Sequence, residues 1–121
     1  MELIKKDNIK ILLNPGIESH QLISPENSSS EMATISRVRV SPGTRNERHQ
    51  HSASEQIWIA FQGQGELLLA DYRTQTIEAG DVVRFAIGEV HGLWNNSGDV
   101  FEYLAVTTPP IDFRAVYQGV K

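Results

Sequence analysis

The chain has 121 residues and no cysteine. This absence excludes disulfide bonds, thiolate catalysis, cysteine-bound zinc and iron–sulfur clusters. Any metal ion would therefore be bound through nitrogen and oxygen atoms. Histidine is scarce as well, with four residues in the chain. Two of them, His49 and His51, are separated by a single position, which marks their segment as a candidate site.

Long apolar runs and basic clusters are also missing. No stretch approaches the apolar length that spans a membrane, and residues 1–16 lack the apolar core and cleavage site of a signal peptide. We therefore expect a cytoplasmic protein without a membrane partner. The net charge is −4, and the most basic segment is IKKD at residues 4–7. Because nucleic-acid binding needs a basic face, no nucleic-acid partner is expected.

The chain shows no sustained helical period of ten or more residues. Instead, short apolar runs are separated by glycine, proline and asparagine, which is typical of an all-β sandwich or barrel. One or two helical turns are expected near the carboxyl end, with Asp112 as N-cap and Gly119 as C-cap. The main runs that predict strands are Ile9–Leu13, Glu31–Val40, Gln56–Phe61, Gly65–Ala70, Asp81–Ile87 and Val100–Val106.

The pair His49 and His51 indicates a chelating site if its segment is a strand. Residues two apart in a strand point to the same side, so both imidazoles would face one ligand. Two imidazoles on one face can bind one divalent ion. The alternative is that both are ordinary surface or turn histidines, since a His-x-His sequence also arises by chance.

The surroundings of the pair resemble the first sequence motif of the cupin superfamily. Residues 43–63 open with glycine and carry His49 and His51 six and eight positions later. A polar residue follows at Glu55 or Gln56, and the segment closes with glycine.

A second segment, GDVVRFAIGEVHGLWN at residues 80–95, resembles the second cupin motif. Ala86 stands where the family usually has proline, Gly88 comes two residues later, His91 three after that and Asn95 four after that. The two motifs occur in the family's order and at its usual separation. Two correctly spaced motifs are far more specific than one.

The resemblance implies a single domain over residues 1–121 with the cupin fold. This fold is a double-stranded β-helix, in which two antiparallel sheets close into a jelly-roll barrel. The resemblance also implies one divalent transition metal ion, Zn, Ni, Fe, Mn or Co, near one mouth of the barrel. The implied metal ligands are His49, His51, Gln56 and His91.

The fourth ligand is the position where the chain departs from the motif. Six residues separate the family's carboxylate ligand from the closing glycine, Gly63, and this spacing selects Gln56 rather than Glu55. A step of one residue in a strand turns a side chain to the opposite face. Both faces of this strand are largely apolar, so the burial pattern does not choose between the two. A subset of small cupins carries glutamine at this position.

Three imidazoles and one amide form an uncharged ligand set, which leaves the full charge of the ion to attract anionic or enolate-like ligands. The resemblance then implies a metal-dependent enzyme for a small polar carboxylate or sugar-derived substrate, acting by isomerisation, ring opening, cyclisation or dioxygenation. The alternative is a non-catalytic domain that binds or senses a small molecule. We also expect a homodimer in which a second copy covers a sheet edge at Ile9–Leu13 or Glu31–Val40.

Four further residues are candidates for the cavity wall. Trp58 lies two residues from Gln56 and would line the same side, unless it is a plain core aromatic. The other three are arginines that either point into the barrel and meet a carboxylate or face solvent or an interface: Arg37, Arg39 and Arg84.

Candidate proton-transfer groups lie in the last strand. Glu102 and Tyr103 are adjacent there, so only one of them can face inward. Arg39 is a third candidate for a catalytic role. His20 falls outside both motifs and is interpreted as an ordinary strand or surface histidine.

Overall fold

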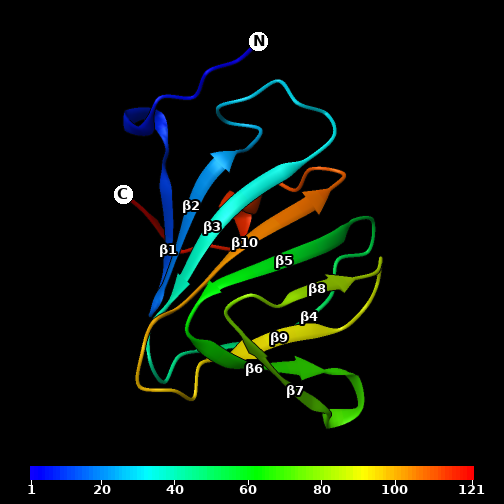
Figure 1. The fold of residues 1–121 in the computed structure, drawn as a ribbon. Coiled ribbons are helices and arrows are strands. Elements are labelled where there is room, and N and C mark those ends of the chain that lie inside the picture. The colour runs from blue at the N-terminus through cyan, green and yellow to red at the C-terminus, as the bar shows by residue number, and fades with distance from the viewer.

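A computed structural model describes all 121 residues and contains two antiparallel sheets that enclose one core (Figure 1). In sheet order, the larger sheet comprises β11 (Gly119–Val120), β1 (Ile11–Asn14), β2 (Ile17–Ile23), β3 (Thr34–Val40), β10 (Phe101–Thr108), β5 (Glu55–Gln62) and β8 (Val82–Phe85). The smaller sheet comprises β4 (Arg45–His49), β9 (His91–Trp94), β6 (Gln64–Leu69) and β7 (Thr74–Glu78). The predicted all-β barrel is confirmed.

The helices are three single turns of 3₁₀ type: η1 (Lys6–Asn8), η2 (Ala70–Tyr72) and η3 (Phe113–Ala115). None is long and apolar enough to span a membrane. The Asp112 side chain accepts a hydrogen bond from the Arg114 backbone N–H at 3.1 Å, which confirms the predicted N-cap. The predicted C-cap is wrong, because Gly119 lies in β11. The cytoplasmic location stays a prediction.

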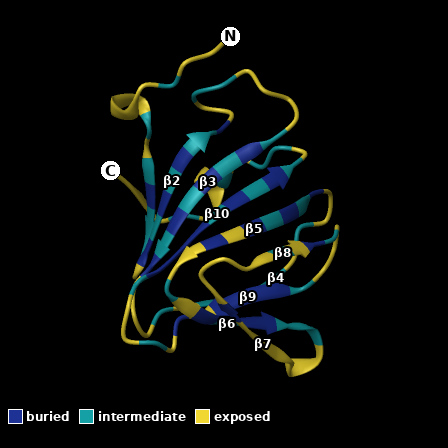
Figure 2. Cartoon of the chain, viewed as in Figure 1, coloured by how far each residue is buried: buried dark blue, intermediate teal, exposed yellow.

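Alternating burial along the strands builds the core (Figure 2). In β5, Gln56, Trp58 and Ala60 are buried, while their neighbours Ile57 and Ile59 are more exposed. This is the pattern expected of a strand with one face toward the barrel interior. The same alternation in β3 and β10 directs one face of the larger sheet toward the smaller sheet.

The carboxyl-terminal residues return to the amino-terminal strand, as the positions of the C label and β1 in Figure 1 indicate. β11 pairs with β1, and the backbone N–H groups of Ile11 and Lys121 each donate to the carbonyl oxygen of the other. β3 lies between β2 and β10. The predicted free edge at these strands is therefore wrong, because the chain itself covers both. The homodimer stays a prediction.

Candidate metal site

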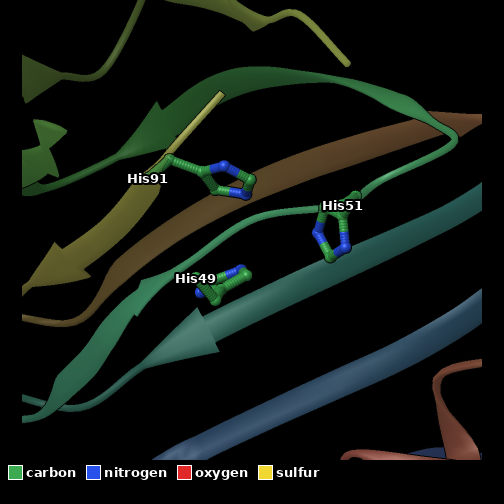
Figure 3. A group of neighbouring side chains, drawn as sticks. All are labelled: His49, His51 and His91. Carbon is green, nitrogen blue, oxygen red and sulfur yellow. The ribbon is translucent and has the colours of Figure 1, made fainter. Parts of the chain in front are cut away.

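Three of the four histidines come together inside the barrel. His49 ends β4, His91 begins β9 and His51 follows in the loop after β4, and their rings point toward one another (Figure 3). One ring nitrogen from each lies within 4.8 Å of the others. The predicted convergence of the three residues is confirmed. His51 lies beyond the end of the strand, so its orientation does not follow from strand alternation alone.

Backbone packing brings the three residues into register. His49 and His91 are cross-strand partners between β4 and β9, with ring centroids 4.4 Å apart. The next residue, Gly92, lies so close to β4 that a Cβ atom there would stand 2.7 Å from the Asn46 carbonyl oxygen. A backbone hydrogen bond holds His51 in place: the Gly88 N–H donates to the His51 carbonyl oxygen at 2.8 Å. The second motif thus positions the histidines of the first.

Hydrogen bonds fix the tautomer of two of the rings. His49 Nδ1 lies 2.8 Å from the Glu47 carbonyl oxygen, and His91 Nδ1 lies 3.0 Å from that of Glu89. A carbonyl oxygen only accepts, so Nδ1 carries the proton in both rings and Nε2 keeps a free lone pair. Metal-binding histidines commonly donate the N–H of their other ring nitrogen to a carbonyl oxygen in this way.

Two of the three imidazoles have a buried ring nitrogen without a hydrogen-bond partner. Nε2 of His51 and Nε2 of His91 make no hydrogen bond and are shielded from solvent. Burial lowers the pKa of His91 to about 4 and also lowers the pKa of His51, so both rings are neutral at pH 7. Unpartnered buried nitrogens are costly, and three converging lone pairs fit a metal ion.

Gln56 and Glu55 lie on opposite faces of β5. Gln56 is 5% exposed and lines the same cavity as His49 and His51. Glu55 accepts a hydrogen bond from Arg84 Nε at 2.9 Å, and its side chain is 31% exposed on the outer face. The strand register therefore directs Gln56, not Glu55, toward the histidines.

Two hydrogen bonds orient the Gln56 amide. The Trp58 indole N–H donates to Oε1 at 2.7 Å, and Nε2 donates to the Thr107 hydroxyl at 2.9 Å. An indole nitrogen only donates, so the atom it contacts must be the amide oxygen. That oxygen keeps a second lone pair with which to contact a ligand.

A cavity of about 400 Å³ adjoins His49 and His51. Trp58 lines it, as predicted, and is also a core residue at 1% exposed. Tyr103 lines it from β10 and stacks on Trp58 with ring centroids 4.1 Å apart. Of the two adjacent candidates in this strand, Tyr103 is therefore the one that faces inward.

The carboxyl-terminal segment supplies a wall that the sequence did not predict. Phe113 and Tyr117 both line the cavity, and the Phe113 ring meets the His51 ring edge-on at 6.2 Å. The Asn14 side chain donates to the Val116 carbonyl oxygen at 3.1 Å, which fastens this segment to the barrel. No local pattern in the sequence could have identified the two aromatic residues, because Tyr117 lies beyond the end of η3 and the segment is held by contacts with a distant strand.

The structure corrects the expectation for Arg37, Arg39 and Glu102. Arg39 Nη1 donates to Glu102 Oε2 at 2.9 Å, and Arg37 Nε lies 3.5 Å from Glu102 Oε1. Since Glu102 is adjacent to the inward-facing Tyr103, this cluster occupies the outer face of the larger sheet. None of the three lines the cavity, so they have neither the predicted wall position nor access to a bound ligand.

Arg84 and His20 also lie outside the cavity. Arg84 is bonded to Glu55 and its side chain is 61% exposed, so the predicted wall position is wrong. His20 in β2 lies 3.4 Å from an Arg37 guanidinium nitrogen on the outer face, apart from the other three histidines.

Comparisons with known proteins agree with this geometry. Residues 36–107 match the cupin domain family. The oxalate-binding protein of Thermotoga maritima is 28% identical over 90 residues, which are 74% of this chain and 74% of that protein. A cupin 2 conserved barrel domain protein from Salinispora arenicola is 28% identical, with a TM-score of 0.70 over 88% of this chain and 87% of that chain. A polyketide cyclase from Streptomyces resistomycificus shares the fold at 20% identity, with a TM-score of 0.78 over 100% of this chain and 84% of that chain.

Proposed function

The chain belongs to the cupin domain family, and from that premise we propose that His49, His51, His91 and Gln56 bind one divalent transition metal ion. The observation that carries the proposal is the convergence of three ring nitrogens within 4.8 Å, two of them buried without a hydrogen-bond partner. The position of Gln56 beside them supports an amide oxygen as the fourth ligand.

The proposed ligand set suits the first-row ions Zn, Ni, Fe, Mn and Co. When bound, such an ion supplies Lewis-acid activation of an oxygen atom of the ligand, and a redox-active ion also supports oxygen chemistry. The protein's part is to hold the imidazoles in one tautomer through the Glu47 and Glu89 carbonyl oxygens, and to orient the Gln56 amide oxygen through Trp58.

We propose that the protein is a metal-dependent enzyme and that the cavity binds its substrate, a small polar carboxylate or a sugar-derived compound. The first choice of reaction is isomerisation, ring opening or cyclisation, and the second is dioxygenation. The cavity is large enough for a small molecule, and Tyr103 and Phe113 form part of its wall. The phenol of Tyr103 donates a hydrogen bond to an oxygen atom of the substrate. The likeness to a polyketide cyclase supports a catalytic use of this fold.

The alternative is a cupin domain that binds its small molecule without converting it. The likeness to a protein named for oxalate binding favours this second function. The two functions differ in whether bonds of the ligand change.

Proton NMR in D₂O separates the two functions. Zinc-, iron- and manganese-loaded protein is incubated with 2-hydroxy acids, 2-oxo acids and hexuronates, with the metal-free protein as control. The enzyme proposal predicts a new product or deuterium incorporation beside the carboxylate or carbonyl group, at least about 100-fold faster than in the control, since a bound metal ion contributes several kcal/mol of charge stabilisation. Ligand binding without any change in these spectra would instead support the non-catalytic function.

A further inference from the structure

The side chains of the cavity wall point no charged group inward, so the proposed metal ion would be the one charge there. Glu47 and Arg48 contribute to the wall. Their charged groups are engaged elsewhere. The Glu47 side chain is 70% exposed and accepts from Arg45 Nε at 2.9 Å. Arg48 Nε donates to the Leu69 carbonyl oxygen at 2.7 Å, and its guanidinium lies over the Tyr72 ring.

The polar groups that do line the cavity are neutral. Besides the amides, they include the hydroxyl groups of Ser19, Ser36, Tyr103 and Tyr117. Burial raises the pKa of Tyr103 well above its ordinary value, and no hydrogen bond opposes this shift. Burial also raises the pKa of Tyr117, with an opposing hydrogen bond to Ser19. Both phenols therefore keep their protons and act as neutral donors.

We propose that the ligand of this cavity carries all of its negative charge on one head group beside the histidines, and presents only neutral oxygen atoms to Tyr103 and Tyr117. This inference rests on the proposed metal site, because the ion is the one positive charge available to the head group. A monoanionic 2-hydroxy or 2-oxo acid with a neutral hydroxylated body has this chemistry.

The same wall rejects a ligand with a second, distant anionic group. A carboxylate or phosphate that leaves water loses more hydration than neutral donors return, and it needs a paired cation as well. Arg48, the one arginine in the wall, is held by the Leu69 carbonyl oxygen and the Tyr72 ring. Arg37 and Arg39 are paired with Glu102 on the outer face. Sugar phosphates and long dicarboxylates are therefore excluded as substrates.

Calorimetric titration of the zinc-loaded protein tests this charge rule with three six-carbon probes that share a head group: 2-hydroxyhexanoate, 2,6-dihydroxyhexanoate and 2-hydroxyadipate. They end in a methyl group, a hydroxyl group and a carboxylate. We expect 2,6-dihydroxyhexanoate to bind best and 2-hydroxyadipate to bind at least about 10-fold more weakly, the cost of one uncompensated polar group. Tight binding of 2-hydroxyadipate, or no binding of any probe at about 10 mM, would overturn the inference.

A variant separates hydrogen bonding from packing. Tyr103→Phe keeps the stack on Trp58 and removes the hydroxyl group. The variant should bind 2,6-dihydroxyhexanoate about 5- to 10-fold more weakly, which is the value of one hydrogen bond. Its binding of 2-hydroxyhexanoate and of zinc should change little. Equal losses for both probes would contradict a donor role for Tyr103. Zinc content is measured first. If the wild-type protein retains no zinc, the proposed metal site is wrong. If it retains zinc but does not bind 2,6-dihydroxyhexanoate best and 2-hydroxyadipate more weakly, only the charge rule is wrong.

Discussion

His49→Ala is expected to weaken metal binding by about 100-fold or more. Losing a hydrogen-bond partner of a metal ligand lowers metal affinity about 10- to 100-fold, so losing an imidazole ligand itself costs at least the upper value. At a metal concentration 100 times the wild-type Kd, binding stabilises the folded protein by about 2.7 kcal/mol. For a domain of this size that is a rise in Tm of about 10 °C, which scanning calorimetry detects. The variant should lose nearly all of this rise.

His20→Ala is the matched control for His49→Ala. His20 is also a partly buried histidine, but it lies on the outer face of the larger sheet beside Arg37. Its loss removes one imidazole without touching the cluster, so the metal-dependent rise in Tm should remain. An undiminished rise in His49→Ala, or its loss in His20→Ala, would contradict the assignment of the site.

Gln56→Ala should weaken metal binding by about 10- to 100-fold, less than loss of a histidine because an amide oxygen is a weaker donor than an imidazole nitrogen. Glu55→Ala should leave metal binding unchanged. Gln56 faces the cavity and Glu55 is paired with Arg84 on the opposite face of β5. Gln56→Glu should retain the ion and bind it more tightly, because a carboxylate adds Coulombic attraction at the same position. Competition titration with a chromophoric chelator measures all three Kd values. Loss of metal binding in Glu55→Ala but not in Gln56→Ala would show that Glu55, and not Gln56, is the fourth ligand.

Trp58→Phe tests whether the orientation of the amide matters. The substitution retains an aromatic ring against Tyr103 and removes the N–H that contacts Gln56 Oε1. Metal binding should weaken about 10-fold, at the low end of the range for losing a hydrogen-bond partner of a ligand. In the Gln56→Glu background the loss should be much smaller, because a carboxylate has two equivalent oxygens. Equal losses in both backgrounds would mean that Trp58 acts through packing alone.

Motif spacing was sufficient to predict the three histidines and the orientation of Gln56. His49 and His91 lie 42 positions apart in the chain and become cross-strand partners, which only the two-motif resemblance could predict. The alternation of β5 was predictable, since a one-residue step separates Gln56 from Glu55. The inward side was not predictable from hydrophobicity, because Ile57, Ile59 and Phe61 make the outer face apolar too.

The arginines and the carboxyl-terminal wall show what single-sequence reasoning cannot determine. Strand alternation pairs Arg37 with Arg39, but the face they share depends on β10, where Glu102 binds both. Phe113 and Tyr117 reach the cavity because residues near Val116 bond to Asn14, about a hundred positions earlier in the chain. Such contacts depend on the closure of the whole barrel and leave no local pattern.

The central claim is that the three histidines and Gln56 hold one metal ion, and elemental analysis tests it most directly. The protein is stripped with a chelator, refilled with a slight excess of zinc and freed of unbound metal by gel filtration. About one zinc ion per chain is predicted, as expected for a preformed chelating set. A refilled protein with no stoichiometric metal, for zinc and for nickel, cobalt, iron and manganese in turn, would contradict the claim.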